Sequence, residues 1–430
     1  MPRIIRRCTI EKKTFVATHV EEILSVADVV VVDVQRDYSK RLLGNVRTGT
    51  ADMIALKETF AKIGAYVDPS ALVLIGTTVV PGTTKQIAFP IIKQAYEKRR
   101  IHTRPLLAYS YERVMPGTDY VASVRDFWRA CRGINREAPE RVVDFLGSVL
   151  DTPIESERAK IIQNSFREVI LAFMDEWSLF AERNGDLKKV IEAIQVRPTH
   201  SNILFRGPGV GGYCLPKDGG LGVWAYQHIL RWEDEIFRMT PLAVDINDTG
   251  ALHVPQLVRD ALRNMDEPVA AADVLVLGVS YREDVEDTRY SGSELIVRRL
   301  TEMGAKIKVH DPDPTNWPEF DTQEDASDAT RARFFSRHAG LKCLQIQKDM
   351  WVAMAVVKVI IPAARHSAYL DLNPDAVSSA VGKPFAIIDC FLILNDQRIC
   401  RYLELGCEVK GLGRGLIKRI KESIRRGTGE

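Results

Sequence analysis

Short apolar runs that alternate with helix-like segments occur in two separate parts of this chain. In the first part the runs are Asp28–Val34, Ala71–Ile75 and Pro105–Tyr109, and the segment between the first two carries apolar residues at helical spacing from Met53 to Ile63. Buried runs of this length between amphipathic helices are typical of βα units around a parallel sheet. This part therefore predicts a parallel-sheet domain.

The second part repeats the pattern. Val274–Gly278, Lys306–Asp311, Ala355–Ile361 and Pro384–Asp389 are strand candidates, and Ser293–Met303 has helical spacing. A second parallel sheet is expected here.

Between the two parts the sequence is helical. Glu157–Asn184 contains neither glycine nor proline and predicts one long helix, Leu187–Ile194 predicts another, and further helix extends to Asn247. The predicted fold class is therefore α/β, with two parallel-sheet domains joined by a long central helix.

Composition excludes several classes of protein. The 430 residues are 46% hydrophobic and 27% charged, with a formal net charge of +2, which argues against a nucleic-acid partner. The basic run Lys418–Arg426 has the character of a solvated helix end, with a weak anion patch as the alternative. No run reaches the roughly 20 apolar residues of a membrane span, and the N-terminus is charged where a signal peptide is apolar. A cytoplasmic location is expected.

The cysteines predict neither disulfides nor a zinc site, because they are odd in number, widely spread and free of a C-x-x-C pair. They are Cys8, Cys131, Cys214, Cys343, Cys390, Cys400 and Cys407. No carboxylate–histidine group has the spacing of a metal site, so no metal is expected and neither His200 nor His366 receives a role.

One cysteine has a setting unlike the others. Arg206–Asp218 holds Cys214 on a glycine-dense loop, with a lysine and an aspartate just behind it. Glycines allow positive φ angles and close approach of a ligand, which indicates a presented thiol rather than a packing cysteine. Gly207, Gly209 and Gly212 match G-x-G-x-x-G, but a dinucleotide turn needs a preceding strand and a following helix, and the sequence predicts neither here.

Five motifs in order carry a resemblance to a known family. They are Gly76–Thr84, Tyr109–Gly117, Lys160–Asn164, the Cys214 loop and Tyr281–Arg289. On these motifs the chain resembles the UDP-glucose/GDP-mannose dehydrogenases, which are NAD-dependent nucleotide-sugar 6-dehydrogenases. These enzymes oxidise a primary alcohol twice, through an aldehyde, to a carboxylate.

The resemblance implies a division into three domains. Residues 1–150 correspond to an NAD-binding Rossmann domain, 151–255 to a central helical domain at a homodimer interface, and 256–430 to a Rossmann-like domain that binds UDP. The family's first strand, glycine-rich turn and second strand have no counterpart, so we expect an N-terminally incomplete NAD domain that lacks its first βα units. Two further departures are Val34–Asp37, where relatives have Val-x-Thr-Pro, and Asp389–Phe391, where they have Asp-Gly-Arg.

The resemblance also implies the roles of particular residues. Cys214 matches the nucleophile, and a thiolate suits addition to an aldehyde. Lys160 and Asn164 lie four apart on one helical face and can converge on an oxyanion, the alternative being a solvated pair. The implied catalytic residues are Cys214, Lys160, Asn164, Asp218, Glu112 and Thr78, with the two carboxylates handling protons and the hydrolytic water.

Binding residues follow in the same way. Those implied for the nucleotide sugar are Phe205, Arg206, Gly207, Gly209, Gly211, Tyr281 and Arg282, and those implied for NAD are Thr77, Thr78, Val79 and Arg289. Cys-Leu-Pro-Lys-Asp occurs in UDP-glucose and GDP-mannose branches, whereas Pro-Gly-Val-Gly-Gly resembles the UDP-N-acetylhexosamine branch, so the sugar stays open. The expected product is a UDP-uronic acid for polysaccharide biosynthesis.

Two rival hypotheses remain. A non-catalytic or truncated homologue would bind nucleotide sugar but not NAD, which the missing glycine-rich turn favours and the joint presence of the catalytic residues opposes. The second is a two-electron 3-hydroxyacid dehydrogenase of similar layout, in which Cys214 would have no catalytic role.

Overall fold

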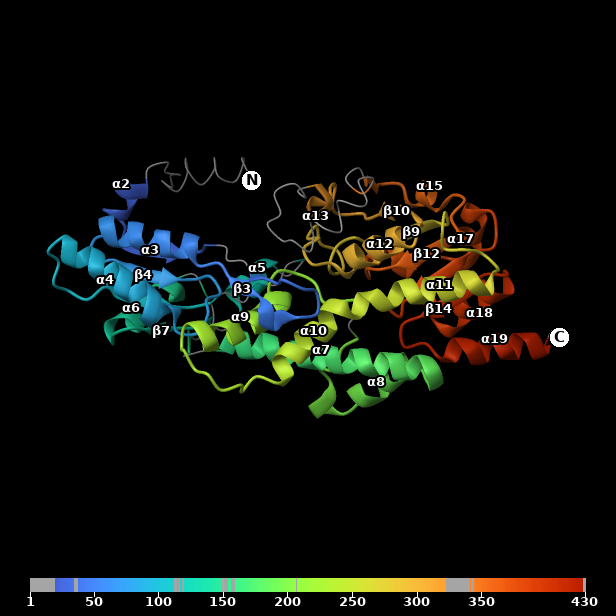
Figure 1. Cartoon of the computed structure of the whole chain (residues 1–430), viewed down its shortest axis with the longest axis horizontal. Coiled ribbons are helices and arrows are strands. Elements are labelled where there is room, and N and C mark those ends of the chain that lie inside the picture. The colour runs from blue at the N-terminus through green and yellow to red at the C-terminus, as the bar shows by residue number, and fades with distance from the viewer. Residues whose placement is uncertain are drawn as a thin grey trace. The chain divides into compact units, whose positions relative to one another are not determined.

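Figure 1 shows the computed structural model of the chain, which divides into two compact units. It describes residues 20–34, 38–111, 114, 117, 120–127, 129–148, 150, 154–155, 159–205, 207–321, 341 and 344–427. Unit 1 comprises Met1–Asp37, Ala51–Lys160 and Trp224–Glu233, and unit 2 comprises Tyr38–Thr50, Ile161–Val223 and Asp234–Glu430.

Unit 1 is built on a four-stranded sheet in the order β1-β4-β5-β7. The first three strands are parallel and β7 pairs antiparallel with β5. Leu72, Leu74 and Ala108 of this sheet pack with Ala138 and Val142 of α6 in one apolar cluster. The strands of the unit are β1 (Val29–Val32), β4 (Leu72–Ile75), β5 (Leu106–Tyr109), β6 (Arg129–Ala130), β7 (Arg132–Gly133) and β8 (Ile154–Glu155). Its helices are α2 (Val20–Leu24), α3 (Ile54–Tyr66), η2 (Thr83–Ala88), α4 (Phe89–Lys98), α5 (Tyr120–Arg125) and α6 (Glu137–Gly147).

Unit 2 contains a six-stranded, fully parallel sheet in the order β11-β10-β9-β12-β13-β14. Alternate residues of β9 point to opposite faces, so Val274 and Val276 enter one apolar cluster with α11 and α12 while Leu275 and Leu277 enter another with α17 and α18. Both faces of the sheet are therefore covered, as in doubly wound folds. The strands are β9 (Asp273–Leu277), β10 (Lys306–His310), β11 (Ile346–Gln347), β12 (Val359–Pro362), β13 (Ala386–Asp389) and β14 (Glu408–Gly411).

The remaining elements of unit 2 are largely helical. Asp186 caps α8 by accepting a 3.0 Å hydrogen bond from the Lys188 backbone N–H. Helices with the sheet are α11 (Val254–Asn264), α12 (Gly292–Glu302), α13 (Pro318–Asp321), α15 (Met350–Met354), α16 (Ser367–Leu370), α17 (Pro374–Val381), α18 (Asp396–Glu404) and α19 (Leu416–Gly427). The others are η1 (Val46–Thr48), α8 (Leu187–Gln195), η3 (Pro198–His200), α10 (Met239–Thr249) and η4 (Gly250–His253), with short strands β2 (Tyr38–Ser39) and β3 (Thr50–Ala51) at its boundary. Most of α7 (Ala159–Asn184) and of α9 (Leu215–His228) belongs to unit 2, while the first two residues of α7 and the last five of α9 fall in unit 1. None of the described helices is long and apolar enough to cross a membrane.

The predicted α/β class is confirmed, with a long helix and two sheets whose strands are parallel except for β7 at the edge of the sheet in unit 1. The helix predicted over Glu157–Asn184 is α7, described from Ala159. The strand predicted over Ala355–Ile361 begins only at Val359, because Val356 adopts a left-handed φ of 61° that breaks extended geometry. Strand β14 was not predicted, since its four residues include Glu408 and Lys410 and form no continuous apolar run.

Candidate active site

Cys214 lies directly before helix α9. Its carbonyl oxygen accepts hydrogen bonds from the backbone N–H groups of Lys217 (3.2 Å) and Asp218 (3.0 Å), which form the first turn. The thiol is half-buried. A helix N-terminus favours negative charge, and the thiolate is the nucleophilic form of cysteine. This position therefore suits a nucleophile.

The sequence-based argument against a dinucleotide turn was half correct. Among the described residues before the loop, Pro198–His200 is a short 3-10 helix rather than a strand, as expected. A helix does follow, however, because Leu215–Pro216 occupies the first turn of α9, where proline is tolerated.

The loop glycines permit close packing against the segment that follows β9. A Cβ at Gly211 would lie 2.6 Å from the Cβ of Tyr281 and 2.8 Å from the carbonyl oxygen of Tyr290. A Cβ at Gly207 would lie 2.3 Å from the ring of Phe391. Since such distances are not tolerated, any side chain at either position would displace the loop.

Two cations flank the aromatic ring beside the thiol. The Arg289 guanidinium carbon lies 4.8 Å and Lys217 Nζ lies 4.6 Å from the centroid of the Tyr213 ring. Asp287 holds Arg289 through bonds of 2.9 Å and 2.6 Å, and this pairing raises the pKa of Arg289, with a smaller contribution from Cys214. Cys214 thus lies within electrostatic range of a cation, which stabilises a thiolate.

A buried polar network connects α7 with α9. Asp218 is 0% exposed, and its Oδ2 accepts a 2.7 Å hydrogen bond from Asn164 Nδ2. Its Oδ1 accepts a 2.9 Å bond from Nζ of Lys217, which is also buried. A buried carboxylate engaged at both oxygens positions its partners. The sequence reasoning did not single out Lys217, although its place in Cys-Leu-Pro-Lys-Asp was the available signal.

Tyr281 and Arg282 follow β9, as the motif predicted. Burial raises the pKa of Tyr281; Arg282 opposes this, while Asp287 and Cys214 add to it. Arg282 Nη2 lies 3.2 Å from Glu283 Oε1, but its Nε is buried without a hydrogen-bond partner among the described residues. That N–H is a donor available to an anionic ligand.

The other predicted site residues are spread over the molecule. Thr77, Thr78 and Val79 follow β4 in unit 1, and the last two are buried. Phe205 packs against the apolar cores, and Gly209 lies against Gly292. Lys160 lies in the first turn of α7, but its side chain, together with Glu112 and Arg206, lies outside the described residues.

The other described cysteines are buried or partly buried. Cys131, Cys390 and Cys407 are buried and Cys400 is half-buried, whereas Cys8 and Cys343 lie outside the described residues.

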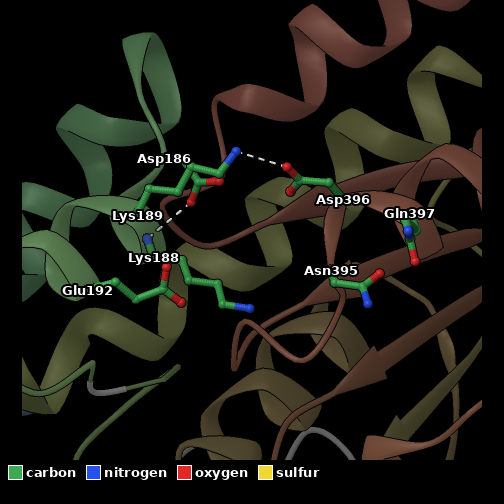
Figure 2. Close-up of a pocket in the computed structure, with 7 residues that line it drawn as sticks. All are labelled: Asp186, Lys188, Lys189, Glu192, Asn395, Asp396 and Gln397. Atoms are coloured by element: carbon green, nitrogen blue, oxygen red, sulfur yellow. Dashed lines mark hydrogen bonds and ion pairs between the residues drawn. The ribbon is translucent and has the colours of Figure 1, made fainter.

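A cavity of about 320 Å³ lies apart from all predicted site residues, between the start of α8 and the start of α18 (Figure 2). Two of its lining residues, Lys189 and Asp396, form an ion pair in which Nζ lies 2.8 Å from Oδ2. All of the residues that line the cavity carry polar or charged groups: Asp186, Lys188, Lys189, Glu192, Asn395, Asp396 and Gln397.

Comparison with known proteins agrees with this architecture. The central domain of the UDP-glucose/GDP-mannose dehydrogenase family matches residues 154–249, and its UDP-binding domain matches 275–396, together half of the chain. The chain therefore has the class of fold found in nucleotide-sugar dehydrogenases, with a cysteine loop before α9. It belongs to the UDP-glucose/GDP-mannose dehydrogenase family.

Individual relatives give a consistent picture. A UDP-N-acetyl-D-mannosamine dehydrogenase of Pyrococcus horikoshii is 28% identical over 269 residues, which cover 61% of this chain and 62% of that relative. Protein CapL of Staphylococcus aureus is 25% identical over 363 residues, which cover 82% of this chain and 77% of that relative. The matched part thus spans less than two thirds of the archaeal relative.

A solved structure shows the same fold. The NDP-N-acetyl-D-galactosaminuronic acid dehydrogenase from Methanosarcina mazei superposes with a TM-score of 0.74 at 24% identity, over 92% of this chain and 79% of that chain.

Proposed function

We propose that this protein is an NAD-dependent nucleotide-sugar 6-dehydrogenase that oxidises a UDP-sugar to the uronic acid. The observation that carries the proposal is the Cys214 loop, whose thiol stands at a helix N-terminus beside Arg289 and the Asn164–Asp218–Lys217 network. Among the two sugar types left open by the sequence, the relatives named UDP-N-acetyl-D-mannosamine dehydrogenase favour a UDP-N-acetylhexosamine over UDP-glucose. The product would serve polysaccharide synthesis.

Cys214 carries the second oxidation. Its thiolate adds to the aldehyde carbon, and the aldehyde oxygen takes up a proton to give a thiohemiacetal. Oxidation then removes a hydride from the carbon and the proton from the hydroxyl group to give a thioester. Water cleaves the thioester and releases the carboxylate, a proton and the Cys214 thiol. NAD, when bound, supplies the two-electron acceptor for each of the two oxidations. Lys160 stabilises the oxyanion by its charge. The Asn164 side chain, held by its hydrogen bond to Asp218, orients the oxyanion or a water. Glu112 and Thr78 assist the hydrolytic water.

The nucleotide sugar binds between the glycine loop and the segment after β9. The unpartnered Arg282 Nε and the backbone of Gly207–Gly211 offer donors to the diphosphate, and Tyr281 borders the thiol. Phe391 presents an apolar ring where relatives usually carry an arginine, so affinity for the diphosphate depends more heavily on Arg282.

NAD is assigned to the edge of unit 1 where β1, β4 and β5 end, since parallel strands place their carboxyl ends at one edge. Thr77, Thr78 and Val79 lie there and fit a ribose or nicotinamide. The Thr77 backbone N–H already donates to the Val32 carbonyl oxygen at 3.3 Å. No glycine-rich pyrophosphate turn is found among the described residues of unit 1. Arg289 is assigned to the cofactor by resemblance.

A homodimer formed through α7 is part of the proposal. One face of this helix exposes apolar side chains at spacings of three, four and seven residues, and the rings of Trp177 and Phe180 meet at 5.4 Å. An exposed apolar row of this length marks an interaction surface. Its members are Ile162, Phe166, Phe173, Trp177 and Phe180. The proposal also includes the three domains expected from the family resemblance, residues 1–150, 151–255 and 256–430, with α7 in the second.

The proposal is tested by incubating the purified chain with NAD and either UDP-N-acetylmannosamine or UDP-glucose, and identifying the product by mass spectrometry. A UDP-uronate that forms with wild type but not with Cys214→Ser supports it. The rival function, a homologue that binds sugar but not NAD, would give calorimetric binding of the UDP-sugar with no product and no NAD binding.

A further inference from the structure

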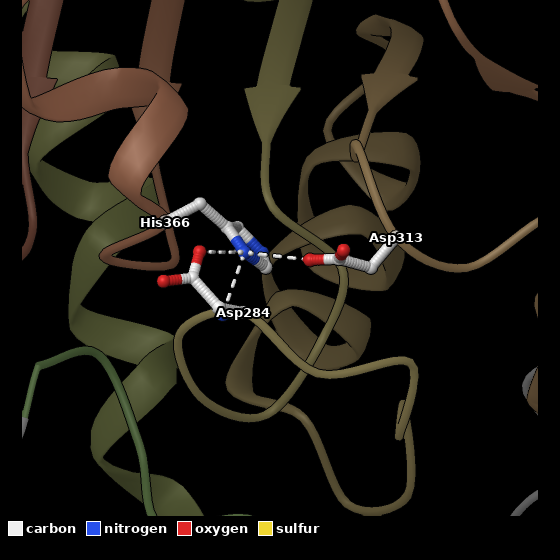
Figure 3. A group of neighbouring side chains, drawn as sticks. All are labelled: Asp284, Asp313 and His366. Carbon is white, nitrogen blue, oxygen red and sulfur yellow. Dashed lines mark hydrogen bonds and ion pairs between the residues drawn. The ribbon is translucent and has the colours of Figure 1, made fainter. Parts of the chain in front are cut away.

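Three side chains that are distant in sequence meet at the carboxyl edge of the sheet in unit 2. Asp284, Asp313 and His366 lie in the loops that follow β9, β10 and β12, and their ligand-type atoms all lie within 4.8 Å of one another (Figure 3). Sequence spacing gave no sign of this group, because strand order rather than chain proximity brings the loops together. The absence of metal-site spacing along the sequence, on which no metal was expected, says nothing about a group that forms only in the folded chain.

The imidazole of His366 is held in one orientation. It is 0% exposed, and Nε2 lies 3.1 Å from Asp311 Oδ2. That carboxylate is itself fixed by the backbone N–H groups of Val279 (2.7 Å) and Ser280 (3.0 Å). Nε2–H therefore donates to Asp311. The Nδ1 lone pair accepts a hydrogen bond from the Asp284 backbone N–H at 3.0 Å, and the carboxylates of Asp284 and Asp313 lie beside it. A histidine that donates one ring N–H to a carboxylate and presents the other nitrogen is the usual arrangement of a metal ligand.

The distances around Nδ1 match a coordination sphere. Nδ1 lies 3.3 Å from Asp313 Oδ2 and 3.6 Å from Asp284 Oδ1. Two ligands of a tetrahedral ion with bonds of 2.0–2.2 Å lie about 3.3–3.6 Å apart. Asp313 Oδ2 is buried and has no hydrogen-bond partner among the described residues. Ser367 N–H orients Asp284 by donating to Oδ1 at 3.0 Å.

We propose that Asp284, Asp313 and His366 bind a divalent transition-metal ion of the zinc class. One imidazole and two carboxylates form a donor set suited to such an ion. The Asp284 and Asp313 side chains are 46% and 35% exposed, which gives the ion a route from solvent and leaves a position for water. The Asp284 backbone N–H donates to Nδ1 at 3.0 Å, and binding exchanges this hydrogen bond for a metal bond.

The ion would connect the loop of Tyr281 and Arg282 to the loops after β10 and β12. This role is structural, and it is separate from the chemistry proposed for Cys214. If no metal binds at this site, the dehydrogenase proposal is unaffected. If the chain shows no dehydrogenase activity, the metal-site proposal is likewise unaffected.

The test is calorimetric titration of the EDTA-treated full chain with ZnCl2, followed by metal analysis after dialysis. All variants carry Cys214→Ser, so that zinc bound to that thiol is not counted. We expect one equivalent of zinc in this background and at least a tenfold weaker affinity after Asp313→Asn. Asp371→Asn, an exposed aspartate on the same unit, is the matched control and should bind as the parent does.

Cobalt(II) absorption provides a second readout, because nitrogen and oxygen ligands give spectra unlike those of thiolates. Asp284→Asn replaces Asp313→Asn if the latter unfolds, as judged by circular dichroism. Saturable zinc binding that both aspartate variants retain unchanged would overturn the proposal, as would the lack of any zinc binding at 0.1 mM by the folded parent. In the second case His366 serves only as a partner of the carboxylates.

Discussion

The first strands of the two sheets, β1 in unit 1 and β9 in unit 2, have similar sequences and different surroundings. β1 is a run of four valines, and Val274–Leu277 of β9 alternates valine and leucine. β9 lies between β10 and β12 and is buried from Val274 to Leu277. Strand β1 pairs only with β4 among the described strands, and Val31 is 51% exposed. An apolar run thus predicts a strand without predicting how many neighbours it has.

The difference bears on ligand binding. In open parallel sheets ligands bind where successive strands depart to opposite sides. Unit 2 has this point at β9, where the chain goes to β10 on one side and β12 on the other. The described strands of unit 1 follow one another from β1 to β5 in a single direction. We therefore expect substitutions in unit 2, where the proposed nucleotide-sugar site lies, to have larger effects than substitutions in unit 1.

The largest effect is expected at the nucleophile. Cys214→Ser should lower uronate formation by roughly 10⁴-fold, because the alcohol cannot replace the thiolate in the second oxidation. UDP-sugar affinity, measured by calorimetry, should change little. Cys400→Ser on α18 is the control. If the serine variant keeps a tenth of the wild-type rate, the chemistry does not depend on this loop.

Asp218→Asn should destabilise unit 2 by about 3–5 kcal/mol, because it leaves the Lys217 ammonium buried without its carboxylate. Guanidinium unfolding measures the change. Asp375→Asn removes an exposed ion pair with Arg401 and should leave the midpoint unchanged. Equal shifts for the two variants would mean that the buried network does not stabilise the fold.

The two strands can be compared directly by truncating a valine in each. Val276→Ala on β9 should cost about 2 kcal/mol of unfolding free energy, from lost apolar burial and the cavity left behind. Val31→Ala on β1 should cost less than about 0.5 kcal/mol, since half of that side chain already meets solvent. A cost for Val31→Ala as large as that for Val276→Ala would show that β1 is covered in solution.

A smaller effect depends on pH. Burial lowers the pKa of His253, but the 2.7 Å hydrogen bond to Glu182 and the charge of that carboxylate, with smaller contributions from Gln256 and Asp175, together outweigh burial and raise the pKa. A raised folded-state pKa adds stability below the unfolded value near 6.5, and this stability is lost as pH rises through the folded value. The free energy of unfolding of wild type should therefore exceed that of His253→Gln by under about 1 kcal/mol at pH 5.5, and by less at pH 8.5. A difference that is constant with pH would exclude the ion pair.

Sequence reasoning was most successful where a single segment carried the information. Strand β4 was predicted because its residues are continuously apolar, and the structure confirms it. The role of Cys214, inferred from the glycines around it, stays a prediction. It failed where distant segments meet. Asp218 bonds to Asn164 across 54 positions, and His366 lies against Asp311 across 55, so neither contact follows from local pattern. The edge position of β1 depends likewise on strand order.

The most direct test of the account counts the NADH formed for each UDP-N-acetylmannosamine consumed by the purified chain. The proposed four-electron oxidation through Cys214 predicts two. One NADH per sugar, or none while the UDP-sugar still binds, would contradict it.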